Sequence, residues 1–270
     1  MKMTDAEFSR LVTFVRDGYG INLEKKRELV ESRLAFHLTQ LGCPSYSQYL
    51  SAAEAAPDGP ECREMIDRLS TNHTYFFREM DAVRDFIDVA APSAFARTGA
   101  VSVWCAAAST GQECWTLAME LDSFVQLRSP SSRYSILATD VSCKALKTGE
   151  KGVYAASELE KIPVRFQSRC TRHAGASAFE IAPELRTHIS WRRFNLMDNF
   201  AFPALFDAVF CRNVMFYFNV STRETLLPKL SSVLKPGGRL YVGVTETVDR
   251  ERRYFDYLAP SIYRKKGASA

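Results

Sequence analysis

The chain has 270 residues, of which 46% are hydrophobic and 24% charged, with a formal net charge of +4. This composition is typical of a soluble protein with a sizeable core, and the length fits one large domain or a catalytic domain with a smaller companion. The net charge is too small to indicate nucleic-acid binding, but it allows a local basic face that docks on an acidic partner.

The N-terminus and the apolar stretches argue against export and membrane insertion. Asp5, Glu7 and Arg10 stand where a signal peptide needs an apolar run. No stretch approaches the roughly 18–20 uncharged apolar residues that span a bilayer. We therefore expect a cytoplasmic protein.

The cysteines and histidines lack the spacing of metal ligands. The seven cysteines are scattered and form no CxxC pair, so we expect reduced, mostly buried thiols. The four histidines, His37, His73, His173 and His188, show no zinc-site pattern either. We expect no metal site.

Residues 4–70 predict helices throughout, with amphipathic apolar spacing and stop signals such as Gly20. The expected helices begin near Thr4, Leu23, Ser45 and Cys62, and residues 56–61 form a turn. This is a compact helical unit without an evident site of its own.

From residue 100 onward, strand-like and helix-like segments alternate, which predicts an α/β domain with a parallel, doubly wound sheet. The expected strands cover 101–107, 134–140, the start of 206–218, and 239–244 after a turn at 235–238. The expected helices cover 112–125, a region near 143–149, and 222–234. Residues 261–266 could add a strand at the sheet edge.

Residues 160–193 interrupt this alternation. The segments RFQSRCTRHAGASAFEIA and THISWRRFNL resemble short antiparallel strands around a turn at Gly175. We expect a small antiparallel β-subdomain inserted in the α/β domain.

Two features suggest a ligand site at the carboxyl edge of the sheet. The small-residue turn in VWCAAASTGQE, residues 103–113, can approach a ligand closely, although it could also be an ordinary βα turn. Asp140 ends the next strand, where a carboxylate can accept hydrogen bonds from ribose hydroxyls or simply cap a helix. The turn does not match GxGxxG or GxxxxGK[ST], so it gives little support to dinucleotide or nucleoside triphosphate binding.

Two further blocks frame this site. STNHTYFFRE, residues 70–79, interleaves Asn72, Thr74 and Arg78 with aromatic residues, and core packing of Phe76 or Phe77 would not explain the polar ones. LKPGGRLYVG, residues 234–243, is a turn before a strand, with an architectural role.

Taken together, these blocks resemble the CheR family of chemotaxis receptor glutamate methyltransferases over essentially the whole length. The matching blocks are ESRL with Arg33, TNHTYFFRE, WCAAASTGQE, ILATDVSCKAL then GVY, FNLMD, FDAVFCRNVMFYF, LKPGGRLYVG then TE, and IYRK. The resemblance implies a Rossmann-like class I methyltransferase domain, residues 71–270, behind an N-terminal receptor-docking domain, residues 1–70. It implies transfer of a methyl group from S-adenosylmethionine to receptor glutamates, with S-adenosylhomocysteine as the product.

The resemblance also implies roles for individual residues. Asn72, Thr74 and Arg78 would bind the methionine end of the cofactor, with Arg78 on its carboxylate and Glu113 on its ammonium group. The remaining expected contacts are Asp140 on the ribose, Asn195 and Leu196 beside the adenine, and Arg212 and Asn213 along the cleft where substrate enters.

Some positions depart from the family pattern or allow two interpretations. The family often has GEEPYS where this chain has GQECWT, which retains Glu113 and can alter the stiffness of the loop. His73 is expected to be an exposed loop residue rather than a base. Tyr217 could act in catalysis or pack in the core.

A glutamate carboxylate is already anionic at neutral pH, so methyl transfer to it needs no general base. Arg78 and Asn213 would position the reactants.

Receptor docking would involve the basic residues of the second helix, although a solvated helix face is the alternative. These residues are Lys25, Lys26, Arg27 and Arg33. Some relatives grip a receptor C-terminal pentapeptide with a glycine-rich loop in the β-subdomain, whereas this chain has only Gly175 there. We expect independence from such a tether, and a monomer.

Three alternatives to receptor methylation in chemotaxis stay open. The chain could methylate a chemoreceptor-like sensor in a non-motility pathway. It could be a non-catalytic interaction module that binds S-adenosylmethionine, although the site residues argue against this. A nicotinamide-dependent oxidoreductase is disfavoured because GxGxxG is absent.

Overall fold

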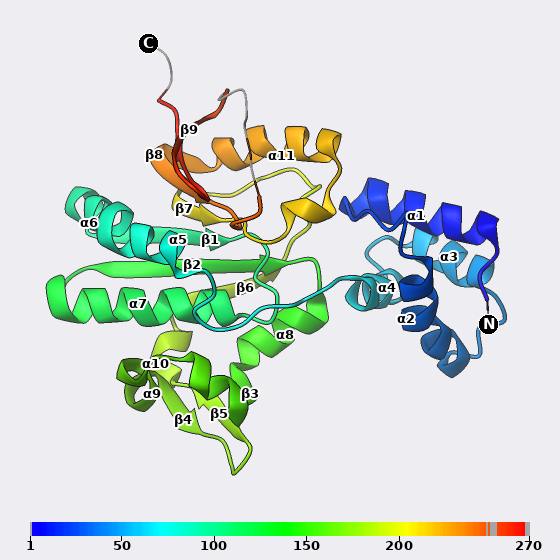
Figure 1. Cartoon of the computed structure of the whole chain (residues 1–270), viewed down its shortest axis with the longest axis horizontal. Helices are drawn as coiled ribbons and strands as arrows, with labels where there is room; N and C mark the ends of the chain where they lie inside the picture. Colours follow the sequence, from blue (N-terminus) through cyan, green and yellow to red (C-terminus); the bar gives the residue numbers. More distant parts are fainter. Residues whose placement is uncertain (1, 247, 249–252, 268–270) are drawn as a thin grey trace.

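The computed structural model describes residues 2–246, 248 and 253–267. Four helices form an N-terminal unit to one side of a domain built on a β-sheet (Figure 1). They are α1 (Asp5–Tyr19), α2 (Arg27–Gln40), α3 (Tyr46–Ala55) and α4 (Pro60–Leu69). The predicted helical N-terminal unit is therefore confirmed.

Local signals fix the helix ends in this unit. Thr4 and Glu7 form a reciprocal capping box at the start of α1, and Gly20 ends the helix with φ of +74°. The second helix begins at Arg27, four residues later than predicted. The reason is a turn in which the Asn22 side chain accepts a hydrogen bond from the backbone N–H of Glu24.

The main sheet has the order β6-β2-β1-β7-β8-β10-β9. Its first five strands are parallel, and β10 runs antiparallel to both of its neighbours. The strands are β1 (Ala100–Cys105), β2 (Arg133–Asp140), β6 (Ile189–Arg193), β7 (Phe206–Phe210), β8 (Leu234–Tyr241), β9 (Phe255–Ala259) and β10 (Ile262–Lys265). This is the predicted α/β architecture.

Helices cover both faces of this sheet and close two apolar cores. One core packs α5 (Met80–Asp85), the π-helical segment Phe86–Ala90, α6 (Ala91–Thr98), α7 (Gln112–Arg128) and α8 (Cys143–Lys151) against the sheet. The other packs α11 (Val220–Ser232) and aromatic residues around Trp104 against the opposite face. The sheet is therefore buried, and its strand ends are held rigidly.

The small antiparallel subdomain is present, but its predicted bounds, 160–193, are wrong at both ends. Its sheet has the order β3-β5-β4, from β3 (Val153–Ala155), β5 (Ala178–Ile181) and β4 (Thr171–His173). Beside them lie the 3₁₀ segment Ala156–Lys161, α9 (Val164–Cys170) and α10 (Pro183–Arg186).

Strand β6, which the sequence assigned to that subdomain, pairs in parallel with β2 in the main sheet. It lies at the sheet edge and buries one face, so its alternating pattern looks like that of a half-buried antiparallel strand. The segment RFQSRC, predicted as strand, is the helix α9.

Two further corrections concern the C-terminal strands. The predicted edge strand is β10, but β9 pairs on its outer side and forms the edge. The predicted turn KPGG lies inside β8, where Gly237 has φ of +73° and the pairing with β7 shifts register.

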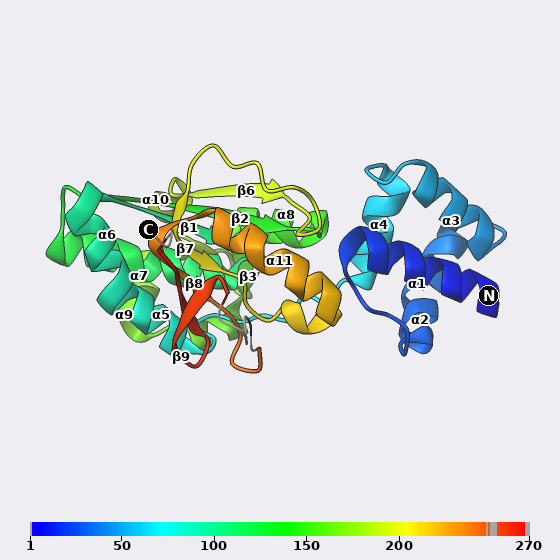
Figure 2. The same cartoon turned by 90° about the horizontal axis from the view of Figure 1, so that it is seen from above.

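The N-terminal unit lies beside the ends of α8 and α11 (Figure 2). Arg193 forms an ion pair with Asp58 at 2.7 Å, and Asp67 accepts hydrogen bonds from the Ser142 hydroxyl at 2.7 Å and from the Lys144 amide. These contacts hold the helical unit against the strand ends of the sheet.

Candidate functional site

A cleft opens where the carboxyl ends of the parallel strands face the N-terminal unit. This edge of a doubly wound sheet is where α/β folds bind ligands. All of the cofactor-binding and catalytic candidates predicted from the sequence line it, namely Asn72, Thr74, Arg78, Glu113, Asp140, Asn195, Leu196, Arg212, Asn213 and Tyr217. Tyr19, Leu23 and Lys26 of the N-terminal unit line it as well.

The turn between β1 and α7 is packed too tightly for larger residues. Gly111 has φ of +92°, and a Cβ there would lie 2.7 Å from the Trp191 ring and 2.8 Å from Gly149 Cα. Ser109, also in the left-handed region at φ of +51°, directs its backbone N–H to Asp140. The small residues of this turn therefore bring the backbone against the strand-end acid.

Asp140, the last residue of β2, is buried and held by backbone donors. Its Oδ2 accepts the Ser109 N–H at 2.8 Å, and its Oδ1 accepts the Ser142 N–H at 2.9 Å. Burial raises the pKa of Asp140, and these hydrogen bonds oppose the rise. The predicted adjacency of the turn and the acid follows from the parallel pairing of β1 with β2.

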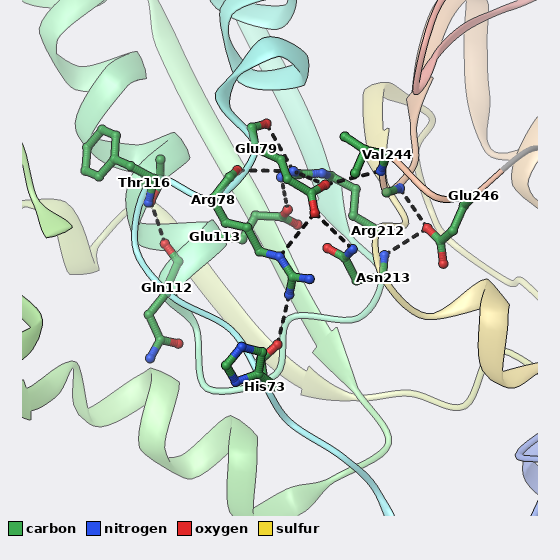
Figure 3. A network of polar contacts seen from close by, with 12 residues as sticks. His73, Arg78, Glu79, Gln112, Glu113, Thr116, Arg212, Asn213, Val244 and Glu246 are labelled. Carbon is green, nitrogen blue, oxygen red and sulfur yellow. Dashed lines mark hydrogen bonds and ion pairs between the residues drawn. The ribbon is translucent and has the colours of Figure 1, made fainter.

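Arg212 is the centre of a buried ion-pair network that joins segments far apart in the chain (Figure 3). Its Nη1 donates to Glu113 Oε2 at 2.6 Å, and its Nη2 donates to Glu79 Oε2 at 3.1 Å. Arg78 donates through Nε to the other Glu79 oxygen at 3.3 Å and through Nη1 to the His73 carbonyl at 3.0 Å. We call Arg78, Glu79, Glu113 and Arg212 the Arg212 network.

The two carboxylates of the Arg212 network have opposite pKa shifts. Burial raises the pKa of Glu113 above its ordinary value, and the nearby Arg212 only partly offsets this. Burial also acts on Glu79, but Arg212 and donors from Val244 and Asn213 outweigh it and lower the pKa of that carboxyl. The two acids share one guanidinium but differ because burial dominates at Glu113, whereas at Glu79 Arg212 and the hydrogen bonds from Val244 and Asn213 together exceed it.

Asn213 occupies the left-handed backbone region, with φ of +56°. Its Nδ2 donates to Glu79 Oε1 at 3.3 Å, and its backbone N–H donates to Glu246 Oε2 at 2.8 Å. A non-glycine residue in this conformation needs support from its surroundings. The two carboxylates provide that support.

The linker 70–79 carries polar residues into the cleft and packs its aromatic residues away from it. Phe76 is buried against Tyr154 and Phe179, and Phe77 stacks on Phe166 at 5.5 Å. Core packing of these phenylalanines therefore involves the β-subdomain, while Asn72, Thr74 and Arg78 line the cleft.

Asn195 and Tyr217 link the cleft to the N-terminal unit. Asn195 Nδ2 donates to the Gly18 carbonyl at 2.7 Å, so this side chain is already committed to a contact between domains. The Tyr217 carbonyl accepts the Asn22 N–H at 3.0 Å, and Lys26 Nζ lies 5.3 Å from the centre of the Tyr217 ring.

In residues 2–246, 248 and 253–267, no group of three or more His, Cys, Asp or Glu side chains is arranged to hold a metal ion. No helix in this part of the chain is both long and apolar enough to cross a bilayer. All seven cysteines are free thiols, five of them buried.

Comparison with known proteins places this cleft in a family. Residues 72–263 match the family "CheR methyltransferase, SAM binding domain", and residues 6–70 match "CheR methyltransferase, all-alpha domain". The chain belongs to the CheR methyltransferase family. The predicted resemblance is confirmed, as is S-adenosylmethionine (SAM) as the cofactor of the cleft domain.

Curated relatives match over nearly the whole chain. The "Chemotaxis protein methyltransferase" of Borreliella burgdorferi is 33% identical over 273 residues, covering 98% of this chain and 96% of that protein. Those of Salmonella typhimurium and Escherichia coli are 33% and 32% identical, each covering 97% of this chain, and 91% and 92% of their own lengths.

The residues of the CheR cleft fit such a cofactor. Within the described part of the chain, two buried polar atoms of cleft residues, Ser109 Oγ and Arg212 Nε, have no hydrogen-bond partner, as expected where a polar ligand binds. Asp140 offers carboxylate oxygens to hydroxyl groups, and Arg78 and Glu113 offer opposite charges to an amino-acid end.

The four basic residues predicted to dock a receptor lie in four different settings. Arg33 Nη1 donates to the Leu69 and Ser70 carbonyls at 2.9 and 3.0 Å, at the end of α4. Arg27 pairs with Asp5 at 2.6 Å, Lys26 lines the cleft, and Lys25 is exposed. They do not form one basic helix face, because Lys25 and Lys26 precede α2.

Sequence reasoning missed two acids of this site, Glu79 and Glu246. Both end blocks that were noticed, TNHTYFFRE and the TE after LKPGGRLYVG. Their roles depend on partners 133 and 33 residues away in the chain. An acid that directly follows a motif is the only local signal that could have found them.

Proposed function

We propose that this chain transfers the methyl group of SAM to glutamate side chains on the cytoplasmic helices of chemoreceptors, forming glutamyl methyl esters in the cytoplasm. The observation that carries the proposal is the match, over 97–98% of the chain, to relatives named chemotaxis protein methyltransferases. Residues 1–70 would dock the receptor, and residues 71–270 would perform the transfer.

In this proposal the two sides of the cleft bind the two ends of the cofactor. Asp140 accepts the ribose hydroxyls, and Asn195 and Leu196 flank the adenine. Arg78 binds the carboxylate, Glu113 faces the ammonium group, and Asn72 and Thr74 close over this end. Because Arg212 is buried against Glu79 and Glu113, its role is to hold their charges in place.

The bound sulfonium supplies an electrophilic methyl group, so the protein needs no metal and no covalent intermediate. The acceptor glutamate is already an anion at neutral pH, with an ordinary pKa of about 4.3. The cleft therefore has to orient the carboxylate oxygen and exclude water, and such positioning can lower a barrier by up to roughly 7–11 kcal/mol. Asn213 lines the acceptor side, and Tyr217 packs between Lys26 and Phe216 rather than acting as a base.

A labelling experiment tests this proposal. Purified chain is incubated with methyl-tritiated SAM and the cytoplasmic fragment of a chemoreceptor, and the labelled fragment is treated with mild base. We expect release of volatile methanol, because glutamyl esters hydrolyse under these conditions. A fragment whose candidate glutamates are changed to glutamine is the matched control and should acquire no label. Base-stable label would contradict ester formation.

Two further points of the proposal concern the partner. The turn between β4 and β5 contains Gly175 as its single glycine, and we propose that receptor methylation does not depend on a C-terminal pentapeptide. Micromolar binding of such a peptide would contradict this. We also propose that the chain acts as a monomer, for which one mass by light scattering is the test.

A further inference from the structure

The end of the LKPGGRLYVG block and the acid Glu246 pack against the loop 213–217, which contributes Asn213 and Tyr217 to the cleft lining. Glu246 is buried, with 6% of its surface exposed. Its Oε2 accepts the backbone N–H of Asn213 at 2.8 Å and of Gly243 at 2.7 Å. Its Oε1 accepts the N–H of Met215 at 2.7 Å and of Phe216 at 3.3 Å. One carboxylate thus binds two loops through four backbone donors.

One of these loops lines the cleft, and the other is tied to the Arg212 network. Asn213 and Tyr217 line the cleft on one loop, and their neighbour Phe216 is 51% exposed. On the other loop Val244 is 60% exposed, and its N–H donates to Glu79 in the Arg212 network at 3.2 Å. The predicted ribose and adenine contacts, Asp140 and Asn195, lie on other elements, at the end of β2 and just after β6.

The atoms around the Glu246 carboxylate are tightly packed. A Cβ at Gly243 would lie 2.7 Å from Asn213 Nδ2 and 2.8 Å from Glu246 Oε2. Asn213 is at the same time held with positive φ, a backbone conformation that its surroundings have to support. The glycine, the acid and the strained asparagine therefore form one unit.

We propose that Glu246 is a positioning residue for the methyl acceptor: it holds the loop 213–217 and the end of β8 so that Asn213 and its neighbours form the acceptor side of the cleft. It acts through the backbone of these loops and contacts neither cofactor nor acceptor. The inference rests on the proposed function, because it names the part of that site on which acceptor geometry depends.

Glu246→Gln is the sharpest test, because it preserves size and replaces one acceptor oxygen with an NH₂ group. In either orientation of the amide, the NH₂ group faces two backbone N–H donors, and these two donors lose their acceptor. We expect faster hydrogen exchange at the amides of residues 213–216 or 243. We expect kcat for receptor methylation to fall by up to about 100-fold, with the Kd for S-adenosylhomocysteine unchanged within about twofold.

Gly243→Ala provides a second variant, since it keeps the carboxylate and displaces it, and it should show the same pattern. Glu224→Gln, on the exposed face of α11, is the matched control and should change none of the three readouts. The proposal is overturned if exchange at these amides is unchanged, if kcat is unchanged, or if affinity for S-adenosylhomocysteine falls in parallel with activity. If wild-type protein binds the product but esterifies no receptor fragment, the proposed function fails, while the exchange measurement still decides whether Glu246 holds the loops.

Discussion

The cleft has two polar sides that are built in different ways. Asp140 ends a strand and is held by the backbone N–H groups of Ser109 and Ser142, within about thirty residues of the chain. In the Arg212 network, Arg212 forms side-chain ion pairs with Glu113 and Glu79, which lie 99 and 133 positions away in the chain. The first side needs only the β1–β2 register, whereas the second needs the linker, α7 and the loop after β7 to be in place together.

This difference predicts different consequences of mutation. Removing Asp140 takes the acceptor away from the backbone N–H groups of Ser109 and Ser142, but it leaves no buried charge without a partner. Removing a member of the Arg212 network leaves a buried charge without its partner, which is much more costly. Damage to the first side should therefore affect ligand binding, and damage to the second should affect folding as well.

The largest effect is expected for Arg212→Met. Two carboxylates, Glu79 and Glu113, would lose their shared cation, and breaking a buried ion pair in this way destabilises proteins by about 3–5 kcal/mol. The free energy of unfolding in urea measures it. Arg84→Met, which breaks an exposed pair with Asp81, is the control and should have little effect. Equal stability of the two variants would remove the distinction between the two sides.

Asp140→Ala should destabilise the fold less than Arg212→Met does, and it should weaken ligand binding. Losing hydrogen bonds to a charged acceptor costs about 1.5–3 kcal/mol, or roughly 10- to 150-fold in the Kd for S-adenosylhomocysteine. Calorimetric titration gives this value, with Asp88→Ala on the exposed surface as the control. An unchanged Kd would show that Asp140 does not bind the ribose.

Measuring stability as a function of pH distinguishes the two carboxylates of the Arg212 network, Glu79 and Glu113. The pKa of Glu79 is lowered, so its contribution to stability is present above the ordinary glutamate value of about 4.3 and is lost as pH falls through the lowered pKa. The pKa of Glu113 is raised, so its contribution is present below the ordinary value and is lost as pH rises through the raised pKa.

Relative to wild type, Glu79→Gln should therefore become more destabilising as pH rises from acid to neutral, and Glu113→Gln should become less so. Unfolding free energies of the three proteins between about pH 3.5 and 7 give the two slopes. Slopes of the same sign would contradict the assignment of one lowered and one raised pKa.

The smallest effect is expected for the basic residues near α2. Of these, Arg33 is held by hydrogen bonds within the protein, and Lys25 is exposed to solvent. Arg33 is fixed by carbonyls at the end of α4, so Arg33→Glu should lower stability as well as methylation. Lys25 is exposed, so Lys25→Glu should leave stability unchanged and raise KM for the receptor by about two- to fivefold. Arg128→Glu on α7 is the matched control, and an equal KM for both reversals would exclude Lys25 from docking.

Much of this fold follows from local signals in the sequence. The caps at Thr4 and Gly20, the alternation of strands and helices after residue 100, and the apolar strand at 206–210 each predict the observed element. The predicted pairing of some strands was wrong. Strand β6 has the pattern of a half-buried strand, and its local sequence does not indicate whether it pairs in the main sheet or in the small one. The same holds for β10, whose place beside β9 depends on a strand the sequence analysis did not identify.

The site divides in the same way. Asp140 and the turn at 106–111 were predictable from strand order, and the other cleft residues came from motif resemblance. The pairing of Arg212 with Glu79 and Glu113 was not predicted, nor was the hold of Glu246 on two loops, because both depend on segments that only the folded chain brings together. The motifs were enough to predict which residues line the cleft, whereas the ion pairs and buried charges among them could be identified only from the structure.

The cleft at the carboxyl ends of β1, β2 and β7 should bind SAM and its demethylated product. Isothermal titration of the purified full chain with S-adenosylhomocysteine measures this binding. We predict saturable binding of one molecule per chain, which SAM competes for and Asp140→Ala weakens. Absence of binding at millimolar product by a folded chain would contradict the account.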